Sequence, residues 1–165
     1  MILLGVDPGT QFSGYSVFRK ESTILSLLDY GVLKLGAQKP LPERVYKFHE
    51  EIDLLMNKNK IDYLVLETPF LGKNAQNFLK LGYLRGILYL LAQKHNIKIT
   101  EFTPREVKQS VTGFGGASKE QVAFMIFRLI PKIEPSVRND ITDALAVGLC
   151  GVWKIGATKP PAVFY

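Results

Sequence analysis

The segment Met1–Gly14, MILLGVDPGTQFSG, decides how the rest of the chain is interpreted. Its apolar run stops at Asp7, and Pro8 and Gly9 follow at once. A short apolar run bounded by turn residues is typical of a buried strand. The Asp7 carboxylate would then lie at the end of that strand, where open α/β sheets bind ligands. Asp also often caps such a turn, so further carboxylates are needed to decide between a structural and a chemical role.

Length and composition limit the class of protein. The chain has 165 residues, of which 47% are hydrophobic, and this suits one domain with a single core. The net charge of +6 favours an anionic partner such as nucleic acid. Cys150 is the only cysteine, so no internal disulfide can form, and we expect a small core residue in a cytoplasmic protein.

Several other classes are excluded by what the sequence lacks. No apolar run approaches the ~20 residues of a membrane span, and Asp7 interrupts the first run too early for a signal peptide. The patterns CxxC, HExxH and GxxxxGK[ST] are absent, which argues against a zinc site and a Walker nucleotide site. We therefore expect no membrane association.

The hydrophobic pattern predicts a mixed sheet. Residues 15–18 and 24–35 are typical of strands, the second with a kink at Gly31, and short turns favour an antiparallel meander. The runs 61–66 and 97–102 each follow a helical pattern, and right-handed crossovers would place them parallel to the first strand.

Helical periodicity and capping residues account for the remainder. Thr103 is a good N-cap before Pro104, and Ser118 forms a capping box with Gln121. We expect an α/β fold with a mixed five-stranded sheet, three antiparallel strands and then two parallel ones, flanked by helices. One domain would cover residues 1–156, followed by an irregular tail at 157–165. The predicted helices span 43–58, 75–96, 104–111, 118–130 and 139–155.

Two glycines stand out in the predicted helix 75–96. Gly82 and Gly86 are four residues apart and therefore share one face. Each costs about 1 kcal/mol relative to alanine in a helix interior. The close approach of another helix would offset this cost, and that helix could come from the same chain or from a second subunit.

Carboxylates recur where a shared site would need them. Glu67 follows the run 61–66 as Asp7 follows the first strand, so neighbouring parallel strands would bring the two side chains together. Asp140 and Asp143 share one face at the start of the last helix. Helix-end stabilisation alone would explain Asp140. Asp143 directly precedes the apolar run 144–147, so we expect it to point inward.

Such a cluster would require cations. Two carboxylates ~4 Å apart repel by about 4 kcal/mol at an effective dielectric near ~20, so they either raise one another's pKa or recruit cations. All-oxygen ligands select Mg²⁺ or Mn²⁺ over zinc. Two such ions can activate a water and stabilise the leaving oxygen of a phosphodiester. Lysine and arginine would hold the DNA backbone around this acidic site.

The motifs, taken together, resemble one family. VDPGTxxxG at the start, LVLE in the middle and DITDALAVG near the end are similar to the RuvC family of Holliday-junction resolvases, in the RNase H-like superfamily. NAQNFLKLGYLRG and PREVKQSVTGFGGASKEQV also match in order and spacing, so the resemblance covers nearly the whole chain. It implies a homodimeric, Mg²⁺-dependent endonuclease with two ions per subunit, for which Mn²⁺ would substitute. It also implies paired symmetrical nicks in four-way DNA junctions during recombination and repair, together with the bacterial branch-migration complex of the RuvA and RuvB type.

The resemblance also implies roles for individual residues. Taken alone, each lysine would be an ordinary surface residue, and Phe70 would be a core anchor about as often as not. By resemblance, Phe70 stacks on an unpaired base at the junction centre, and the helix around Gly82 and Gly86 lies near the dimer interface. The four catalytic, metal-binding carboxylates would be Asp7, Glu67, Asp140 and Asp143, and the DNA-binding lysines Lys108 and Lys119. We also expect Lys73 to bind DNA.

Three alternatives fit parts of the pattern. Residues 7–10, DPGT, match the DxGxT phosphate loop of actin-like kinases and ATPases, but those proteins need a second such domain and a second phosphate loop. A structure-selective DNA-binding protein with a decayed site is disfavoured because all four carboxylates are present. The shorter YqgF-like nucleases share the opening motif but lack the DITDALA ending in this form.

Overall fold

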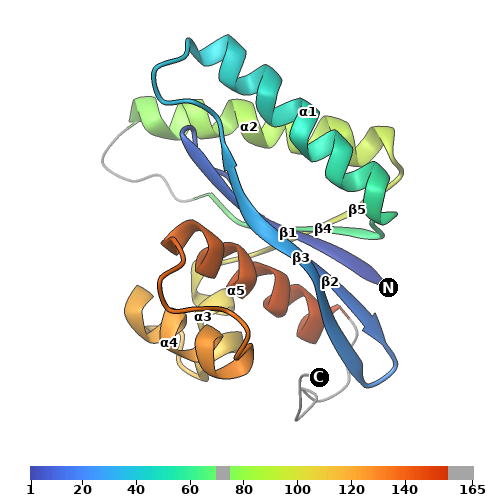
Figure 1. Cartoon of the computed structure of the whole chain (residues 1–165), viewed down its shortest axis with the longest axis vertical. Coiled ribbons are helices and arrows are strands. Elements are labelled where there is room, and N and C mark those ends of the chain that lie inside the picture. Colours follow the sequence, from blue (N-terminus) through green and yellow to red (C-terminus); the bar gives the residue numbers. More distant parts are fainter. Residues whose placement is uncertain (70–74, 156–165) are drawn as a thin grey trace.

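A five-stranded mixed sheet lies at the centre of the molecule, with helices on both faces (Figure 1). The computed structural model describes residues 1–69 and 75–155. The strand order is β3-β2-β1-β4-β5. The strands are β1 (Ile2–Asp7), β2 (Phe12–Glu21), β3 (Ile24–Lys34), β4 (Tyr63–Glu67) and β5 (Lys98–Phe102).

The strand directions confirm the expected sheet. β1 pairs antiparallel with β2, and β2 with β3, whereas β4 is parallel to both β1 and β5. β2 is longer than the predicted 15–18, because the chain stays extended from Phe12 and pairs with neighbours on both sides. The predicted boundary at residue 156 and the predicted tail at 157–165 lie outside the described residues.

The expected kink at Gly31 is wrong. Gly31 pairs regularly with Tyr15, and a Cβ at Gly31 would lie 3.0 Å from the Tyr15 ring, so this glycine makes room for an aromatic side chain. The irregularity in β3 lies instead at Leu28, since Val17 pairs with Asp29 and Phe18 with Leu27.

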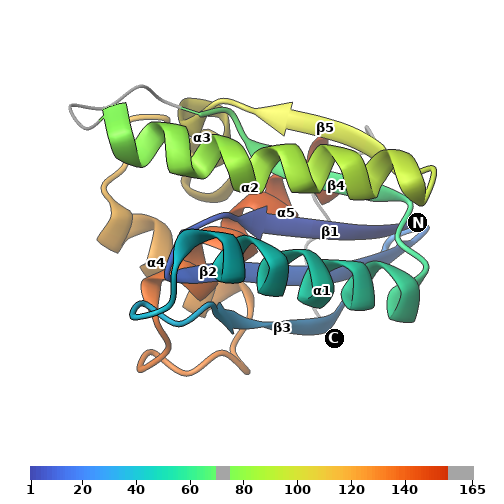
Figure 2. The same ribbon diagram turned by 90° about the horizontal axis from the view of Figure 1, so that it is seen from above.

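Two groups of helices cover the two faces of the sheet. Seen from the side and from above, α1 and α2 lie side by side on one face, while α3, α4 and α5 lie on the other (Figures 1 and 2). Each helix lies within two residues of its predicted range. Within the described part of the chain, none of them combines the length and hydrophobicity that crossing a bilayer needs. Their bounds are α1 Leu41–Asn59, α2 Ala75–Lys94, α3 Pro104–Thr112, α4 Lys119–Leu129 and α5 Asn139–Lys154.

Alternation along the strands separates two cores. In β1, Leu4 and Val6 face α1 and α2, whereas Leu3 packs in the core that includes α3, α4 and α5. In β4, Leu66 likewise faces α1 and α2, and Val65 packs in the core that includes α3, α4 and α5. The last residue of each strand therefore faces the α5 side of the sheet.

α5 packs very closely on the sheet because small residues line the contact. A Cβ on Gly5 would lie 2.7 Å from the backbone of Gly148, so the two glycines allow direct backbone approach. The Ser16 hydroxyl donates a hydrogen bond of 2.8 Å to the carbonyl oxygen of Ala144. Cys150 is buried within the same helix, as predicted.

Candidate active site

The ends of two parallel strands meet the beginning of α5 at one point. Asp7 is the last residue of β1 and Glu67 the last of β4, and these strands are parallel neighbours. Asp7 pairs with Gly14 of β2. A Cβ on Gly14 would lie only 1.8 Å from the carbonyl oxygen of Asp140, so this glycine lets the first turn of α5 approach the end of β1.

A cavity of about 430 Å³ opens at this point. Three of the four predicted carboxylates line it, Asp7, Glu67 and Asp143, together with Lys108 of α3 and Lys119 of α4. The rest of its wall is mainly apolar, with side chains from α3, α4 and α5. Residues distant in sequence therefore share one cavity, as the sequence predicts.

Asp140 occupies a different position from the other three. It is not among the residues that line this cavity, and its carboxylate accepts a hydrogen bond of 3.0 Å from Arg138 Nε. Its charge still helps to raise the pKa of Asp7. Asp140 is thus part of the electrostatic cluster, with its side chain held at the edge by an arginine.

Burial and mutual repulsion raise the pKa of two carboxylates. Burial is the main cause of the rise in the pKa of Asp7 to about 7, and the charge of Asp143 adds to it. Burial and Asp143 likewise raise the pKa of Glu67, while Lys119 and Lys108 oppose the rise. A carboxyl group that is half protonated near neutral pH becomes fully ionised when a cation lies beside it.

Lys119 is the cation that balances this cluster most directly. Its Nζ donates a hydrogen bond of 2.8 Å to Asp143 Oδ2, and this contact raises the pKa of Lys119. Lys119 opens α4 directly after the N-cap Ser118, where the helix dipole disfavours a positive charge. The carboxylate therefore offsets an otherwise unfavourable location for the lysine.

The chemistry of the side chains fits a hard divalent cation. Carboxylate oxygens are the ligands that Mg²⁺ and Mn²⁺ prefer, and the buried Asp7 needs positive charge to ionise fully. Across residues 1–69 and 75–155, however, no three acidic, histidine or cysteine side chains converge closely enough to hold a metal ion as they stand. Asp143 and Asp140 are paired with Lys119 and Arg138 instead. Metal binding would require these two carboxylates to exchange partners.

Sequence reasoning missed one residue that supports this site, Arg85. Its side chain is buried, and Nη1 donates a hydrogen bond of 2.8 Å to the carbonyl oxygen of Glu67. Nη2 pairs with the Glu101 carboxylate and donates to the Tyr89 hydroxyl at 2.9 Å. The only local signal is a charged residue within the buried stripe of α2.

The remaining predicted residues have mixed outcomes. Phe70 and Lys73 lie outside the described residues. Gly82 and Gly86 are exposed, and a Cβ on either would meet no described atom within 4 Å beyond the neighbouring residues and backbone of its own helix. The alternative in which another helix of the same chain packs on these glycines is therefore wrong, and the second-subunit alternative stays a prediction.

The family model and the curated relatives that match this chain carry the same name. The family model described as "Crossover junction endodeoxyribonuclease RuvC" matches residues 3–151. A curated protein of that name from Chlorobium phaeobacteroides is 43% identical, covering 98% of this chain and 88% of the relative. Its counterpart from Alkaliphilus oremlandii is 35% identical, covering 91% of this chain and 92% of the relative.

Solved structures show the same fold. The structure titled "T. thermophilus RuvC in complex with Holliday junction substrate" has a TM-score of 0.85 and 28% identity, covering 97% of this chain and 99% of that one. The yeast mitochondrial Holliday junction resolvase Ydc2 has a TM-score of 0.65 at 14% identity, covering 90% of this chain and 77% of that one, and supports the fold alone. The chain belongs to the RuvC family of crossover junction endodeoxyribonucleases.

Proposed function

We propose that this endonuclease nicks four-way DNA junctions symmetrically with divalent metal ions held by Asp7, Glu67, Asp140 and Asp143. The observation that carries the proposal is the shared cavity, in which partly buried carboxylates from β1, β4 and α5 meet two lysines. The T. thermophilus RuvC structure, which matches this chain with a TM-score of 0.85, was solved in complex with a Holliday junction substrate. This supports the same substrate for the present chain.

The metal ion gives this acidic cavity its affinity for a phosphodiester. When bound, a pair of Mg²⁺ ions per subunit supplies an activated water and stabilises the leaving oxygen, and Mn²⁺ would substitute. Asp7 contributes a buried carboxylate whose raised pKa falls once a cation is present. Lys119, which pairs with Asp143 in this structure, would pair with a DNA phosphate instead. The Asp143 carboxylate would then be free to bind the metal ion.

Lysines around the cavity hold the DNA backbone. Lys108 and Lys119 line the cavity itself and would contact phosphates beside the scissile bond. Lys73 is a further proposed DNA-binding residue, and by family resemblance Phe70 stacks on an unpaired base at the junction centre. The net charge of +6 supports these contacts at longer range.

The exposed face of α2 is the proposed homodimer interface. A shallow groove of about 530 Å³ runs between α1 and α2 and includes both Gly82 and Gly86. Three large side chains on α2 are each about half exposed, namely Leu79, Tyr83 and Leu90. Exposed apolar side chains that gather on one helix are typical of an interaction surface. A second copy would bury these side chains and bring a second active site to the opposite strand. The bacterial branch-migration complex of the RuvA and RuvB type is the proposed partner in the cytoplasm.

A nicking assay tests this function directly. The enzyme is incubated with a synthetic four-way junction and, in parallel, with a linear duplex of the same sequence, each with Mg²⁺ or with a chelator. We expect paired nicks in the junction only, and only with Mg²⁺. A protein with a decayed site would bind the junction without nicking it, and equal cutting of the duplex would contradict junction selectivity.

A further inference from the structure

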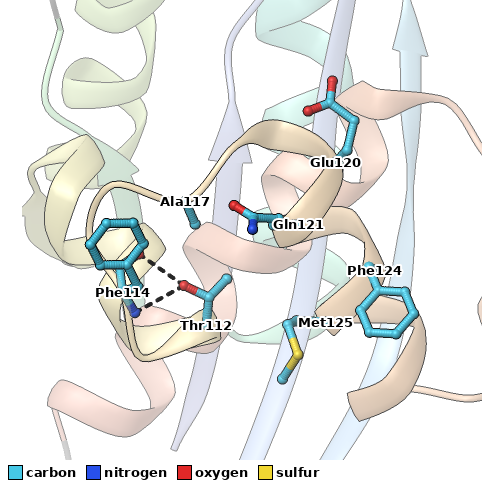
Figure 3. Close-up of a pocket in the computed structure, with 7 residues that line it drawn as sticks. All are labelled: Thr112, Phe114, Ala117, Glu120, Gln121, Phe124 and Met125. Atoms are coloured by element: carbon cyan, nitrogen blue, oxygen red, sulfur yellow. Dashed lines mark hydrogen bonds between the residues drawn. The ribbon is translucent and has the colours of Figure 1, made fainter.

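An aromatic-walled cavity lies beside the active site along α4. Its volume is about 410 Å³, within the range of ligand-binding pockets. Thr112 and Met125 form part of its base, and Figure 3 shows two phenylalanine rings on either side of them. These rings belong to Phe114, in the loop before α4, and Phe124, on α4 itself.

A further hollow lies between this aromatic cavity and the proposed catalytic cavity along α4. This hollow, of about 280 Å³, shares Glu120 and Phe124 with the aromatic cavity. It shares Lys119 and Asp143 with the catalytic cavity. Neighbouring hollows that share wall residues therefore follow one another along the groove from the carboxylates past the beginning of α4 to the two aromatic rings.

Phe114 is held in an exposed position. Phe114 is 65% exposed, but Thr112 fixes its backbone. The Thr112 hydroxyl accepts a hydrogen bond of 3.1 Å from the Phe114 N–H and donates one of 2.9 Å to the Phe114 carbonyl oxygen. The ring rests against Gly116, where a Cβ would lie 2.7 Å from it. An exposed aromatic side chain that is fixed in this way contributes little to the core and is prepared for an external partner.

Phe124 is fixed from its outer side. It is 56% exposed, and the Arg128 guanidinium lies 5.4 Å from the centroid of its ring, in a cation–π contact one helical turn away. Arg128 also adds a positive charge at this end of the groove, while Lys119 does so at the catalytic end.

The polar groups between the rings do not suit a phosphate. Glu120 lines the cavity, and hydrogen bonding to Ser118 lowers the pKa of Glu120, so the cavity carries a negative charge. Gln121 uses its Oε1 to accept from the Ser118 N–H at 2.8 Å, and among described residues nothing accepts from its Nε2. The cavity thus offers one hydrogen-bond acceptor and one donor beside two aromatic rings, which suits a flat, neutral ring with polar edges.

We infer that the aromatic cavity binds an unpaired nucleobase next to the scissile phosphate, stacked on Phe114 and Phe124, and that Glu120 favours bases with an exocyclic amino group. Aromatic stacking of this kind contributes about 1–3 kcal/mol per base, which corresponds to roughly 5- to 150-fold in affinity. Carboxylates accept hydrogen bonds from the amino group of cytosine. The inference rests on the proposed function, because it requires DNA in the catalytic cavity.

Fluorescence of 2-aminopurine tests the stacking without any cleavage. The probe is placed in turn at each nucleotide that flanks the scissile phosphate of a synthetic junction, in buffer with a chelator. We expect quenching by the wild-type protein at one position, and loss of that quenching in Phe114→Ala and Phe124→Ala, with junction affinity about tenfold lower. Tyr46→Ala is the matched control, because Tyr46 is 63% exposed on α1, across the sheet from the groove.

The outcomes separate this inference from the proposed function. Wild-type protein that quenches at no position, or phenylalanine variants that quench like Tyr46→Ala, would overturn the inference even if Mg²⁺-dependent nicking is normal. Failure of nicking with intact quenching would instead overturn the proposed function and leave the base site standing.

Base preference provides the second measurement. Junctions that carry each of the four bases at the quenched position are nicked in the presence of Mg²⁺. We expect a preference of about tenfold for bases with an exocyclic amino group (cytosine, adenine and guanine) over thymine, and its loss in Glu120→Ala, which removes the hydrogen-bond acceptor. An unchanged preference in Glu120→Ala would show that Glu120 does not read the base.

Discussion

The Arg85 guanidinium donates a hydrogen bond of 2.8 Å to the backbone carbonyl oxygen of Glu67. This contact joins α2, on one face of the sheet, to the strand end whose side chain faces the proposed catalytic cavity on the other. Glu101 of β5 and Tyr89 of α2 complete the network, so the arginine charge is paired although its side chain is buried. Because α2 also carries the proposed dimer face, the network connects that face to a proposed catalytic carboxylate.

Replacing Arg85 by lysine should therefore reduce nicking more than binding. A lysine keeps the charge but cannot donate in three fixed directions to Glu67, Tyr89 and Glu101 at once. We expect junction affinity close to wild type and a nicking rate at least about tenfold lower, measured by gel shift and single-turnover assays. Tyr89→Phe is the control, since it removes one link and leaves the bond to Glu67. Equal rates for Arg85→Lys and wild type would refute the positioning role.

Asp7→Asn should abolish nicking and leave junction binding intact. The amide matches the shape of the carboxyl group but lacks the charge that a divalent ion requires. Lys108 and Lys119, which would hold the phosphates, are unchanged. Binding is measured by fluorescence anisotropy in a chelator, and nicking by gel electrophoresis with Mg²⁺. Nicking by Asp7→Asn at a rate near that of the wild type would exclude Asp7 as an essential ligand.

The common location of Asp7 and Glu67 is predictable from the sequence, for a physical reason. Strand alternation and right-handed parallel connections depend on short stretches of chain, and together they place both strand ends on one edge of the sheet. The partners of these carboxylates are not predictable in this way. The bonds from Arg85 to Glu67 and from Lys119 to Asp143 join residues 18 and 24 positions apart, and they depend on how whole helices pack.

The two glycine pairs show the same distinction. Gly5 and Gly148 appear unremarkable in the sequence, yet they allow α5 to approach β1 and thus bring Asp143 to the site. Gly82 and Gly86 attract notice through their spacing, yet no described residue packs on them within the chain. Helix propensity identifies a glycine that costs stability, but only the packed structure shows what occupies the space it leaves.

The stability of the metal-free protein should fall as pH rises from about 4 to 7. The pKa of Asp7 is about 7 in the folded protein against 3.8 ordinarily, so in this range the folded state retains a proton that the unfolded chain has lost. The loss in the free energy of unfolding from Asp7 is of the order of 4 kcal/mol, and Glu67 acts in the same direction. Urea unfolding in a chelator at several pH values measures this loss.

The Asp7→Asn variant is the control for this pH dependence. It cannot titrate at this position, so its free energy of unfolding should fall much less between pH 4 and 7. Addition of Mg²⁺ at pH 8 should stabilise the wild type and have little effect on the variant, because a ligand that binds only the folded state raises its stability. Identical pH profiles for the two proteins would show that Asp7 is not the group responsible.

Substitution of leucine at Gly86 should separate folding from dimerisation. A Cβ at this position meets no described atom within 4 Å, so the larger side chain fits in the isolated chain, and removal of glycine should stabilise α2 by about 1 kcal/mol. In a dimer built on this face, the same side chain would hold the two α2 helices apart. We expect a folded monomer by sedimentation and thermal unfolding, with junction nicking at least about tenfold lower. The control is Ala37→Leu, at an exposed position in the segment before α1. If Gly86→Leu still forms dimers at the same protein concentrations as the wild type, the interface lies elsewhere.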